Sequence, residues 1–200
     1  MQAGFVWLDE AVPGILWDAK YASEDNFTGA AVDGYAQNRL AGTVELAAAL
    51  AIAAKRAEKT GLRLLLWDAY RPQRAVDRFL AWCAAPEDGK TKRRHYPNIE
   101  KTDIVPLGYV AARSGHSRGS AVDLTLARPD GVPLEMGGCF DLMDAISHHG
   151  APVAEEAARN RLLLRGIMEE SGFAPYENEW WHYSLAQEPY PETYFDFLPG

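Results

Sequence analysis

Apolar residues recur every three to four positions in two long stretches of the chain, and this spacing predicts two helices. The first covers residues 43–59, with Glu45 in its first turn and Gly61 placed to end it. The second covers residues 155–171 and is followed by another glycine. A third helix is expected after Pro72, because a proline suits the first turn of a helix, where its missing N–H would be unpaired anyway.

Three shorter segments predict strands. Residues 62–67 form a continuous apolar run typical of a buried strand, and residues 179–185 are rich in aromatic side chains. Residues 120–127 alternate like a half-buried strand, and a turn at 128–131 could pair them with residues 132–136 in a hairpin. This order of elements predicts an α+β fold with a mostly antiparallel central sheet flanked by helices.

The remaining segments lack clear periodicity. We expect residues 1–32 to be loop with short strands. Residues 86–112 are polar and predict a long surface excursion, in which the basic cluster at 90–94 and the neighbouring His95 are solvated. The tail from Gln187 is rich in proline and aromatic residues and is expected to lie across the surface.

Composition narrows the class of protein. The 200 residues are 48% hydrophobic and 24% charged, which predicts one globular domain spanning residues 1–200. A domain of this size can bury a sufficient core without disulfide bonds or structural metal ions. Its two cysteines, Cys83 and Cys139, give no disulfide framework and are expected to act as small core residues. A net charge of −8 disfavours nucleic acid and anionic membranes as partners. No targeting signal or apolar run of membrane-spanning length is visible, which predicts a cytoplasmic protein.

The first stretch that holds candidate functional residues runs from Ser114 to Asp123. It holds His116 and Asp123, seven positions apart, with Gly119 between them to let the chain bend. Imidazole nitrogen and carboxylate oxygen are both ordinary zinc ligands. By itself the pair is better explained as a loop histidine and a strand-end aspartate.

A second stretch joins a carboxylate and an imidazole, Glu179 and His182, among bulky aromatic residues. In a regular strand these two side chains face opposite sides, so a shared site requires a bulge or a strand that begins after Glu179. An aromatic wall also raises the pKa of a carboxyl group toward a value useful for a general base. The simpler alternative is an apolar strand with polar ends.

Together the two stretches predict one metal site of three ligands, His116, Asp123 and His182, with Glu179 beside it. Three protein ligands leave a fourth position open for water, which is typical of catalytic zinc. Arg71 follows a predicted strand and could stabilise an oxyanion, although on its own it is better explained by a surface ion pair with Asp68.

These stretches resemble the zinc D-Ala-D-Ala dipeptidase family as a set. The resemblance covers essentially the whole chain. It rests on Asp68-Ala69-Tyr70-Arg71-Pro72, Ser114-x-His116-x-x-Gly119-x-Ala121-x-Asp123 and Glu179-x-x-His182, and further on residues 17–22, 25–29, 96–99, 140–144, 147–149, 188–191 and 194–197. The chain departs from the family pattern in having Gly115 and a shortened spacing between Asp123 and the Glu-x-x-His element, neither of which touches a ligand or the base.

The resemblance implies a fold, an activity and a set of roles. The fold is the small α+β metallopeptidase fold shared with D,D-carboxypeptidases and the Hedgehog signalling domain. One Zn²⁺ per chain would be bound by His116, Asp123 and His182, with Glu179 as base and Arg71 stabilising the transition state. The remaining family positions, which would hold or support a small zwitterionic dipeptide, are Tyr21, Asp68, Ser114 and Asp141.

Alternatives remain open at this point. The same ligands would serve a zinc D,D-carboxypeptidase that trims a peptidoglycan pentapeptide, and a zinc domain of this kind could also bind a partner without catalysis. Retention of Glu179 and Arg71 speaks against the second possibility. A dipeptidase could serve glycopeptide (vancomycin) resistance or recycling of cell-wall D-alanine, and it could act as a homo-oligomer.

Overall fold

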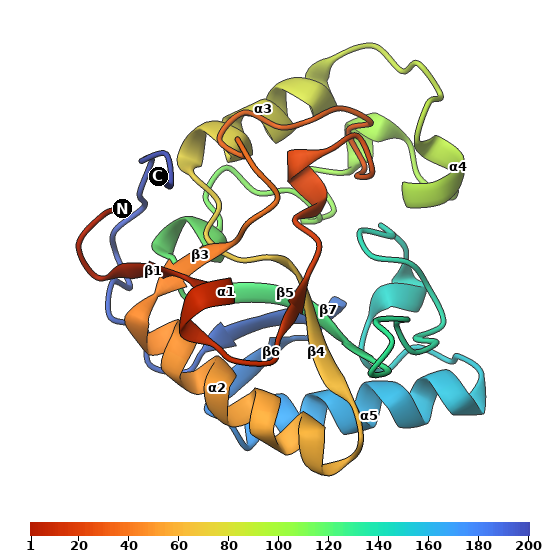
Figure 1. Ribbon diagram of the computed structural model, residues 1–200. Coiled ribbons are helices and arrows are strands. Elements are labelled where there is room, and N and C mark those ends of the chain that lie inside the picture. Colours follow the sequence, from red (N-terminus) through yellow and green to blue (C-terminus); the bar gives the residue numbers. More distant parts are fainter.

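The computed structural model describes residues 1–200, in which helices and strands alternate along the chain (Figure 1). The elements in order are β1 (Phe5–Trp7), α1 (Leu8–Ala11), β2 (Leu16–Trp17), β3 (Ala41–Thr43), α2 (Val44–Lys59), β4 (Arg63–Asp68), α3 (Gln73–Ala84), α4 (Lys92–His95), β5 (Ala121–Ala127), α5 (Glu155–Glu169), β6 (Phe173–Tyr176) and β7 (Glu179–Leu185). Short 3-10 turns link several of them. The predicted helices and the strand at 179–185 are confirmed, with ends that move by at most two residues.

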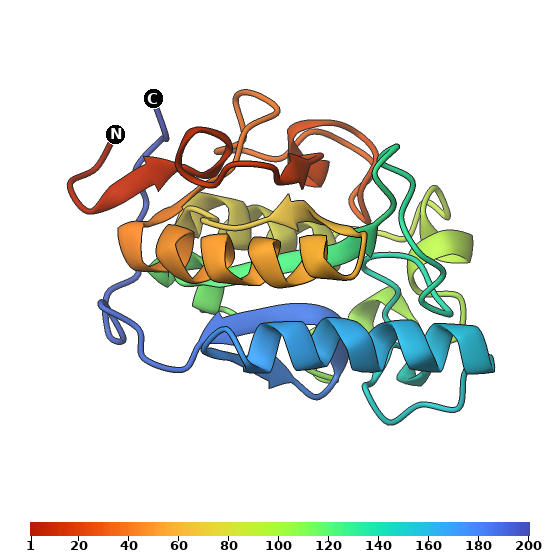
Figure 2. The same cartoon turned by 60° about the horizontal axis from the view of Figure 1, so that its bottom comes forward.

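A five-stranded sheet in the order β2-β4-β5-β7-β6 forms the centre of the molecule. Only the short edge strand β2 runs parallel to its neighbour, and every other pair is antiparallel. A separate pair, β1 and β3, lies beside it. Helices α2 and α5 lie side by side along one side of the sheet, whereas α3 lies on the other (Figures 1 and 2). The predicted α+β class and mostly antiparallel sheet are therefore confirmed.

The ends of α2 follow from its sequence. The Thr43 hydroxyl accepts a hydrogen bond from the Leu46 amide at 3.1 Å and so caps the first turn. At the other end Gly61 adopts a left-handed conformation, φ +78°, that stops the helix as expected. The buried face of α2 belongs to a core of 39 residues that extends from Leu8 to Leu185.

Strand β5 differs from its half-buried prediction, since all seven of its residues are buried. It pairs with β4 on one side and β7 on the other, and both faces of the sheet are covered at this position. The predicted hairpin with residues 132–136 is reduced to a single bridge between Ala127 and Pro133. Two backbone hydrogen bonds flank this bridge, from the Arg128 amide to the Val132 carbonyl and from the Leu134 amide to the Leu126 carbonyl, both at 2.9 Å.

The excursion at 86–112 also differs from prediction. Its basic side chains are largely outside, but His95 is only 2% exposed and not solvated. His95 Nδ1 lies 3.1 Å from the Asp141 carbonyl oxygen, and its own carbonyl accepts from the Met143 amide at 2.7 Å. Burial lowers the pKa of His95 to about 4. The excursion therefore packs against the segment around Asp141 instead of extending into solvent.

The two cysteines are both free. Cys83 is buried as expected, whereas Cys139 is only half-buried and its Sγ lies 3.5 Å from the Arg94 carbonyl oxygen. None of the helices is both long enough and apolar enough to cross a membrane. The tail after Gln187 does lie across the surface, where Tyr190, Phe195 and Phe197 pack on Phe5.

We predict that Gly119→Ala destabilises the fold more than Gly61→Ala. Both glycines have nearly the same positive φ, +77° and +78°. A Cβ at Gly119 would lie 2.3 Å from Cε1 of Phe5, whereas one at Gly61 meets nothing within 4 Å. Gly61→Ala should cost about 1 kcal/mol for the backbone alone, and Gly119→Ala an additional ~1–3 kcal/mol for overpacking. Urea denaturation measures both, and equal losses would show that the Phe5 contact is unimportant.

A second prediction concerns the pH dependence of stability. The unfolded chain protonates His95 near pH 6.5 and the folded chain only near pH 4, so this contribution to the free energy of unfolding is complete above pH 6.5 and lost as the pH falls toward 4. His95→Asn keeps an amide donor but cannot titrate. Relative to the variant, the wild type should lose about 1–2 kcal/mol between pH 7.5 and pH 5. If the free energies of unfolding of the two proteins fell by the same amount over this pH range, the assignment to His95 would be contradicted.

Candidate active site

A cavity of about 260 Å³ opens between the sheet, α3 and the loops that follow the strands. It collects residues that are far apart in the sequence. Eight of the nine candidate site residues line it, namely Tyr21, Arg71, Ser114, His116, Asp123, Asp141, Glu179 and His182. The ninth, Asp68, is fully buried behind Arg71.

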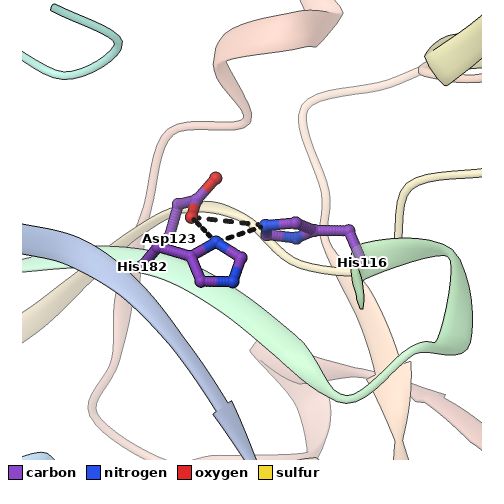
Figure 3. Close-up of side chains that lie close together, drawn as sticks. All are labelled: His116, Asp123 and His182. Carbon is purple, nitrogen blue, oxygen red and sulfur yellow. Dashed lines mark hydrogen bonds and ion pairs between the residues drawn. The ribbon is translucent and has the colours of Figure 1, made fainter. Parts of the chain in front are cut away.

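His116, Asp123 and His182 meet at one point in this cavity (Figure 3). Asp123 on β5 and His182 on β7 are direct partners in the antiparallel ladder, so their side chains lie on the same face of the sheet. His116 comes from the 3-10 turn Gly115–Arg118. Asp123 Oδ1 lies 3.0 Å from His182 Nδ1 and 3.3 Å from His116 Nε2, and the two nitrogens are 3.1 Å apart.

The surroundings orient the ring of His116. Its Nδ1 lies 2.7 Å from the Ala69 carbonyl oxygen, which can only accept, so Nδ1 carries the proton. Nε2 therefore presents a lone pair toward His182 and Asp123. A hydrogen bond of this kind to the far nitrogen is how proteins fix a metal-binding imidazole.

These three atoms fit a tetrahedral zinc ion. Bonds of about 2.0–2.1 Å at tetrahedral angles place neighbouring ligand atoms roughly 3.3–3.4 Å apart, close to the 3.0–3.3 Å observed. Burial alone would raise the pKa of Asp123, but the charges and hydrogen bonds of His116 and His182 outweigh it and hold that pKa well below its usual range. Asp123 is thus a carboxylate, the form that binds metal.

Glu179 lies beside the triad because the β6–β7 ladder is irregular. Pro175 pairs with Tyr183 whereas the next residue, Tyr176, pairs with Glu179, so β7 advances by four residues while β6 advances by one. This bulge, one of the two possibilities expected from the sequence, brings Glu179 Oε2 within 3.8 Å of His182 Nδ1. Burial raises the pKa of Glu179 to about 7, against the opposing attraction of His182. A carboxyl group with such a pKa can both take and return a proton near neutral pH.

Arg71 forms an ion pair with Asp68, but inside the cavity wall and not at the surface. Its Nε donates to Asp68 Oδ2 at 2.9 Å, and its Nη2 lies 3.5 Å from Asp123 Oδ2. The second oxygen of Asp68 accepts from the Tyr35 hydroxyl at 2.7 Å. Although burial lowers the pKa of Arg71, the negative charge of Asp68 and other anionic neighbours raise it overall, so the guanidinium stays charged.

Asp141 is a second carboxyl group that lines the cavity without belonging to the triad. It is the one residue other than glycine with positive φ, 56°, and Tyr21 donates a hydrogen bond to its Oδ2 at 2.8 Å. Burial, reinforced by the charge of Asp123, raises the pKa of Asp141 well above its usual value. A cation placed next to Asp141 would restore its ionised form.

Ser114 shapes the turn that carries His116. Its Oγ accepts from the His116 amide at 3.2 Å and caps the turn Gly115–Arg118. The adjacent histidines His148 and His149 do not line the cavity. His149 is half-buried, and its ring packs against that of Tyr183 with centroids 5.9 Å apart.

Sequence reasoning missed several residues of the site. Tyr35, which holds Asp68, stands alone in a loop without a motif, and no pattern in the sequence indicates it. Phe79 carries a helical period that marks it as core, yet its ring also lies 5.0 Å below the Arg71 guanidinium. Tyr109 and Arg113 fall in or next to the excursion that was expected to be solvated, but both line the cavity.

Comparison with known proteins agrees with this geometry. A peptidase M15 family model, described as D-ala-D-ala dipeptidase, matches residues 1–199. A Streptomyces coelicolor protein named D-alanyl-D-alanine dipeptidase is 60% identical over 98% of both chains, and one of the same name from Enterococcus faecium is 56% identical over 98% of both. An Escherichia coli protein of that name is 39% identical over 88% of this chain and 81% of its own. The chain belongs to the M15 family of D-Ala-D-Ala dipeptidases and is a hydrolase.

Proposed function

We propose that residues 1–200 act as one catalytic domain that hydrolyses D-Ala-D-Ala to two D-alanines, with one zinc ion held by His116, Asp123 and His182. The observation that carries this proposal is the site itself. Three ligand atoms lie 3.0–3.3 Å apart in a cavity that also holds a carboxyl group with a pKa of about 7. The names of the relatives supply the substrate.

Bound zinc would supply Lewis acidity, which lowers the pKa of water and polarises a carbonyl group. Glu179 accepts the proton of the attacking water on its carboxylate. The water oxygen adds to the peptide carbon, the C–N bond breaks, and Glu179 returns the same proton to the leaving nitrogen. One carboxyl group can perform both transfers because its pKa lies near the working pH.

Arg71 stabilises the negative charge that develops on the carbonyl oxygen. Its guanidinium is already held by Asp68 and stacked near the rings of Tyr21 and Phe79, at 5.1 and 5.0 Å. A donor that is fixed before the reaction needs no reorganisation when charge appears. Asp68, fully buried and itself held by Tyr35, thus serves the reaction through Arg71.

The substrate is a small zwitterion, and each of its two charged ends has a partner at the cavity. Asp141, with Tyr21 beside it, receives the ammonium group, and Ser114 lines the wall next to the ligand turn. Apart from Arg71, the cavity is lined by one arginine, Arg113, which has no ion pair with a carboxylate of the chain. We assign the substrate carboxylate to Arg113.

Replacing the proposed base tests the mechanism. Glu179→Gln keeps the size of the side chain but cannot accept a proton, so kcat should fall by roughly 10²–10⁴-fold. Zinc should still bind stoichiometrically because Glu179 is not a ligand. His116→Ala is the complementary variant and should lose the metal. A Glu179→Gln enzyme with near-normal kcat would remove Glu179 from this role, and zinc retained by His116→Ala would show the ligand set to be wrong.

Substrate length separates the dipeptidase from the D,D-carboxypeptidase. A site with Asp141 facing the ammonium group should cleave D-Ala-D-Ala and reject UDP-linked pentapeptide by at least 100-fold in kcat/KM, because the longer chain has an amide where the ammonium would lie. Comparable rates on both substrates would favour the carboxypeptidase. Activity lost on chelation and restored by zinc would exclude a non-catalytic partner-binding domain. The same assay is run with the ester D-Ala-D-Lac. An enzyme that serves glycopeptide resistance must leave this ester unhydrolysed.

A further inference from the structure

Two loops deliver the catalytic groups from different parts of the chain. The Arg71 loop, residues 69–74, leads from β4 into α3, and the His116 loop, residues 114–119, leads into β5. Two hydrogen bonds join them directly: the Arg71 amide donates to the His116 carbonyl oxygen at 3.2 Å, and His116 Nδ1 donates to the Ala69 carbonyl oxygen at 2.7 Å. Both of these bonds involve His116, so the positions of residues 72–74 and 117–119 depend on other contacts.

The tail segment 188–197, here called the C-terminal strap, makes those contacts. The Phe195 amide donates to the Ser117 carbonyl in the His116 loop at 2.8 Å. The carbonyl of the same residue accepts from the Gln73 amide in the Arg71 loop at 3.0 Å. One peptide residue therefore bridges the two loops with its own backbone.

An ion pair ties the strap to each loop on either side of this bridge. Arg118 of the His116 loop donates from Nε and Nη2 to the two oxygens of Glu188, both at 2.6 Å. Arg74 of the Arg71 loop donates to the two oxygens of Asp196 at 2.8 and 2.9 Å. Such two-point pairs fix direction as well as distance.

The strap also completes the start of α3. Pro72 stands at the N-cap of this helix and has no side chain that could accept a hydrogen bond. The first free amides, of Gln73 and Arg74, are instead satisfied by the Phe195 carbonyl and by Asp196 Oδ1 at 2.9 Å. A carboxylate at this end also suits the helix dipole. The turn that carries Arg71 is thus capped from the far end of the chain.

The strap itself is anchored by aromatic packing. The Phe197 ring stacks on Tyr70 with centroids 4.4 Å apart, and the Tyr70 hydroxyl accepts from the Phe197 amide at 3.0 Å. The Phe195 ring packs edge-on against Phe5 at 5.1 Å. No residue of the strap lines the cavity. Its influence on catalysis must therefore pass through the residues that it contacts, namely the two loops and Arg113, whose guanidinium lies 5.0 Å from the Tyr194 ring centroid.

From these contacts we infer that Glu188, Phe195 and Asp196 are positioning residues for the proposed hydrolysis, and this inference rests on the proposed function. Glu188 holds the loop of the zinc ligand His116, and Asp196 holds the loop of Arg71. Displacing a catalytic group by about 1 Å can cost 10²-fold in rate. Removing the Glu188 ion pair should therefore impair zinc binding, whereas removing the Asp196 ion pair should impair the catalytic step.

The test compares Glu188→Ala with Asp196→Ala in the full chain. Zinc affinity is measured by competition with a chelator. The constants kcat and KM are measured on D-Ala-D-Ala at saturating zinc, and Tm is measured by calorimetry. Glu188→Ala should weaken zinc binding by about tenfold, as losing a group that orients a ligand does. Asp196→Ala should leave zinc affinity within twofold but lower kcat about tenfold. KM should stay unchanged, because the Asp196 carboxylate bonds only Arg74 and not Asp141 or Arg113, the groups assigned to the two ends of the substrate.

Conservative and control variants complete the design. Glu188→Gln and Asp196→Asn keep an acceptor oxygen and should show smaller effects in the same directions, which keeps the test decisive where an alanine variant does not fold. Glu170→Ala removes the Arg56–Glu170 pair far from the site and should change neither quantity.

Losses of zinc affinity and kcat that simply follow Tm in both strap variants, or that stay within twofold of the control, would overturn the inference. A wild type without turnover on D-Ala-D-Ala would refute the proposed function, and the zinc arm would still decide the role of Glu188.

Discussion

The buried carboxylate of Asp123 is the constraint on which the rest of the site depends. An ionised group in the middle of a central strand is stable only if its oxygens find charged or hydrogen-bonding partners. One oxygen lies between His116 and His182, and the other faces Arg71. Each partner then needs support of its own, because a half-satisfied buried network is worse than an apolar core.

That requirement extends outward in a chain of partners. The charge of Arg71 is balanced by Asp68, and the second oxygen of Asp68 is satisfied by Tyr35. The far nitrogen of His116 is satisfied by the Ala69 carbonyl, which lies in the same loop as Arg71. The three proposed metal ligands and Arg71 are therefore parts of one network, and moving one displaces the others.

The same cavity keeps its carboxyl groups in different states. Nearby imidazoles lower the pKa of Asp123, whereas burial raises that of Glu179 to about 7 and that of Asp141 well above normal. Groups of one chemical type are thus suited to the three different roles proposed for them, as ligand, as base and as receptor for a cation. Dividing the roles by environment in this way is a general means of running acid and base chemistry near neutral pH.

Sequence reasoning recovered the parts of this design that are local. Thr43 and Gly61 mark the ends of α2, and the conflict between the spacing of Glu179 and His182 and a regular strand correctly required a bulge. The burial of His95 and the contact between Tyr35 and Asp68 could not be predicted, because they join segments more than 30 residues apart with no periodicity to connect them. The proposed roles of the nine site residues stay predictions.

The strap illustrates why a proline-rich tail is hard to interpret from sequence alone. The strap provides hydrogen-bond partners for groups elsewhere in the fold. It accepts from the α3 amides that Pro72 leaves uncapped, and it donates to a carbonyl beside His116 that no strand pairs. Gly119 allows Phe5 to approach the His116 loop, and Phe5 in turn supports Phe195, so both ends of the chain converge on one ligand. The termini lie side by side in both views (Figures 1 and 2). Because these contacts join segments at opposite ends of the sequence, the geometry around His116 and Arg71 depends on long-range packing as well as on the strands that carry Asp123 and His182.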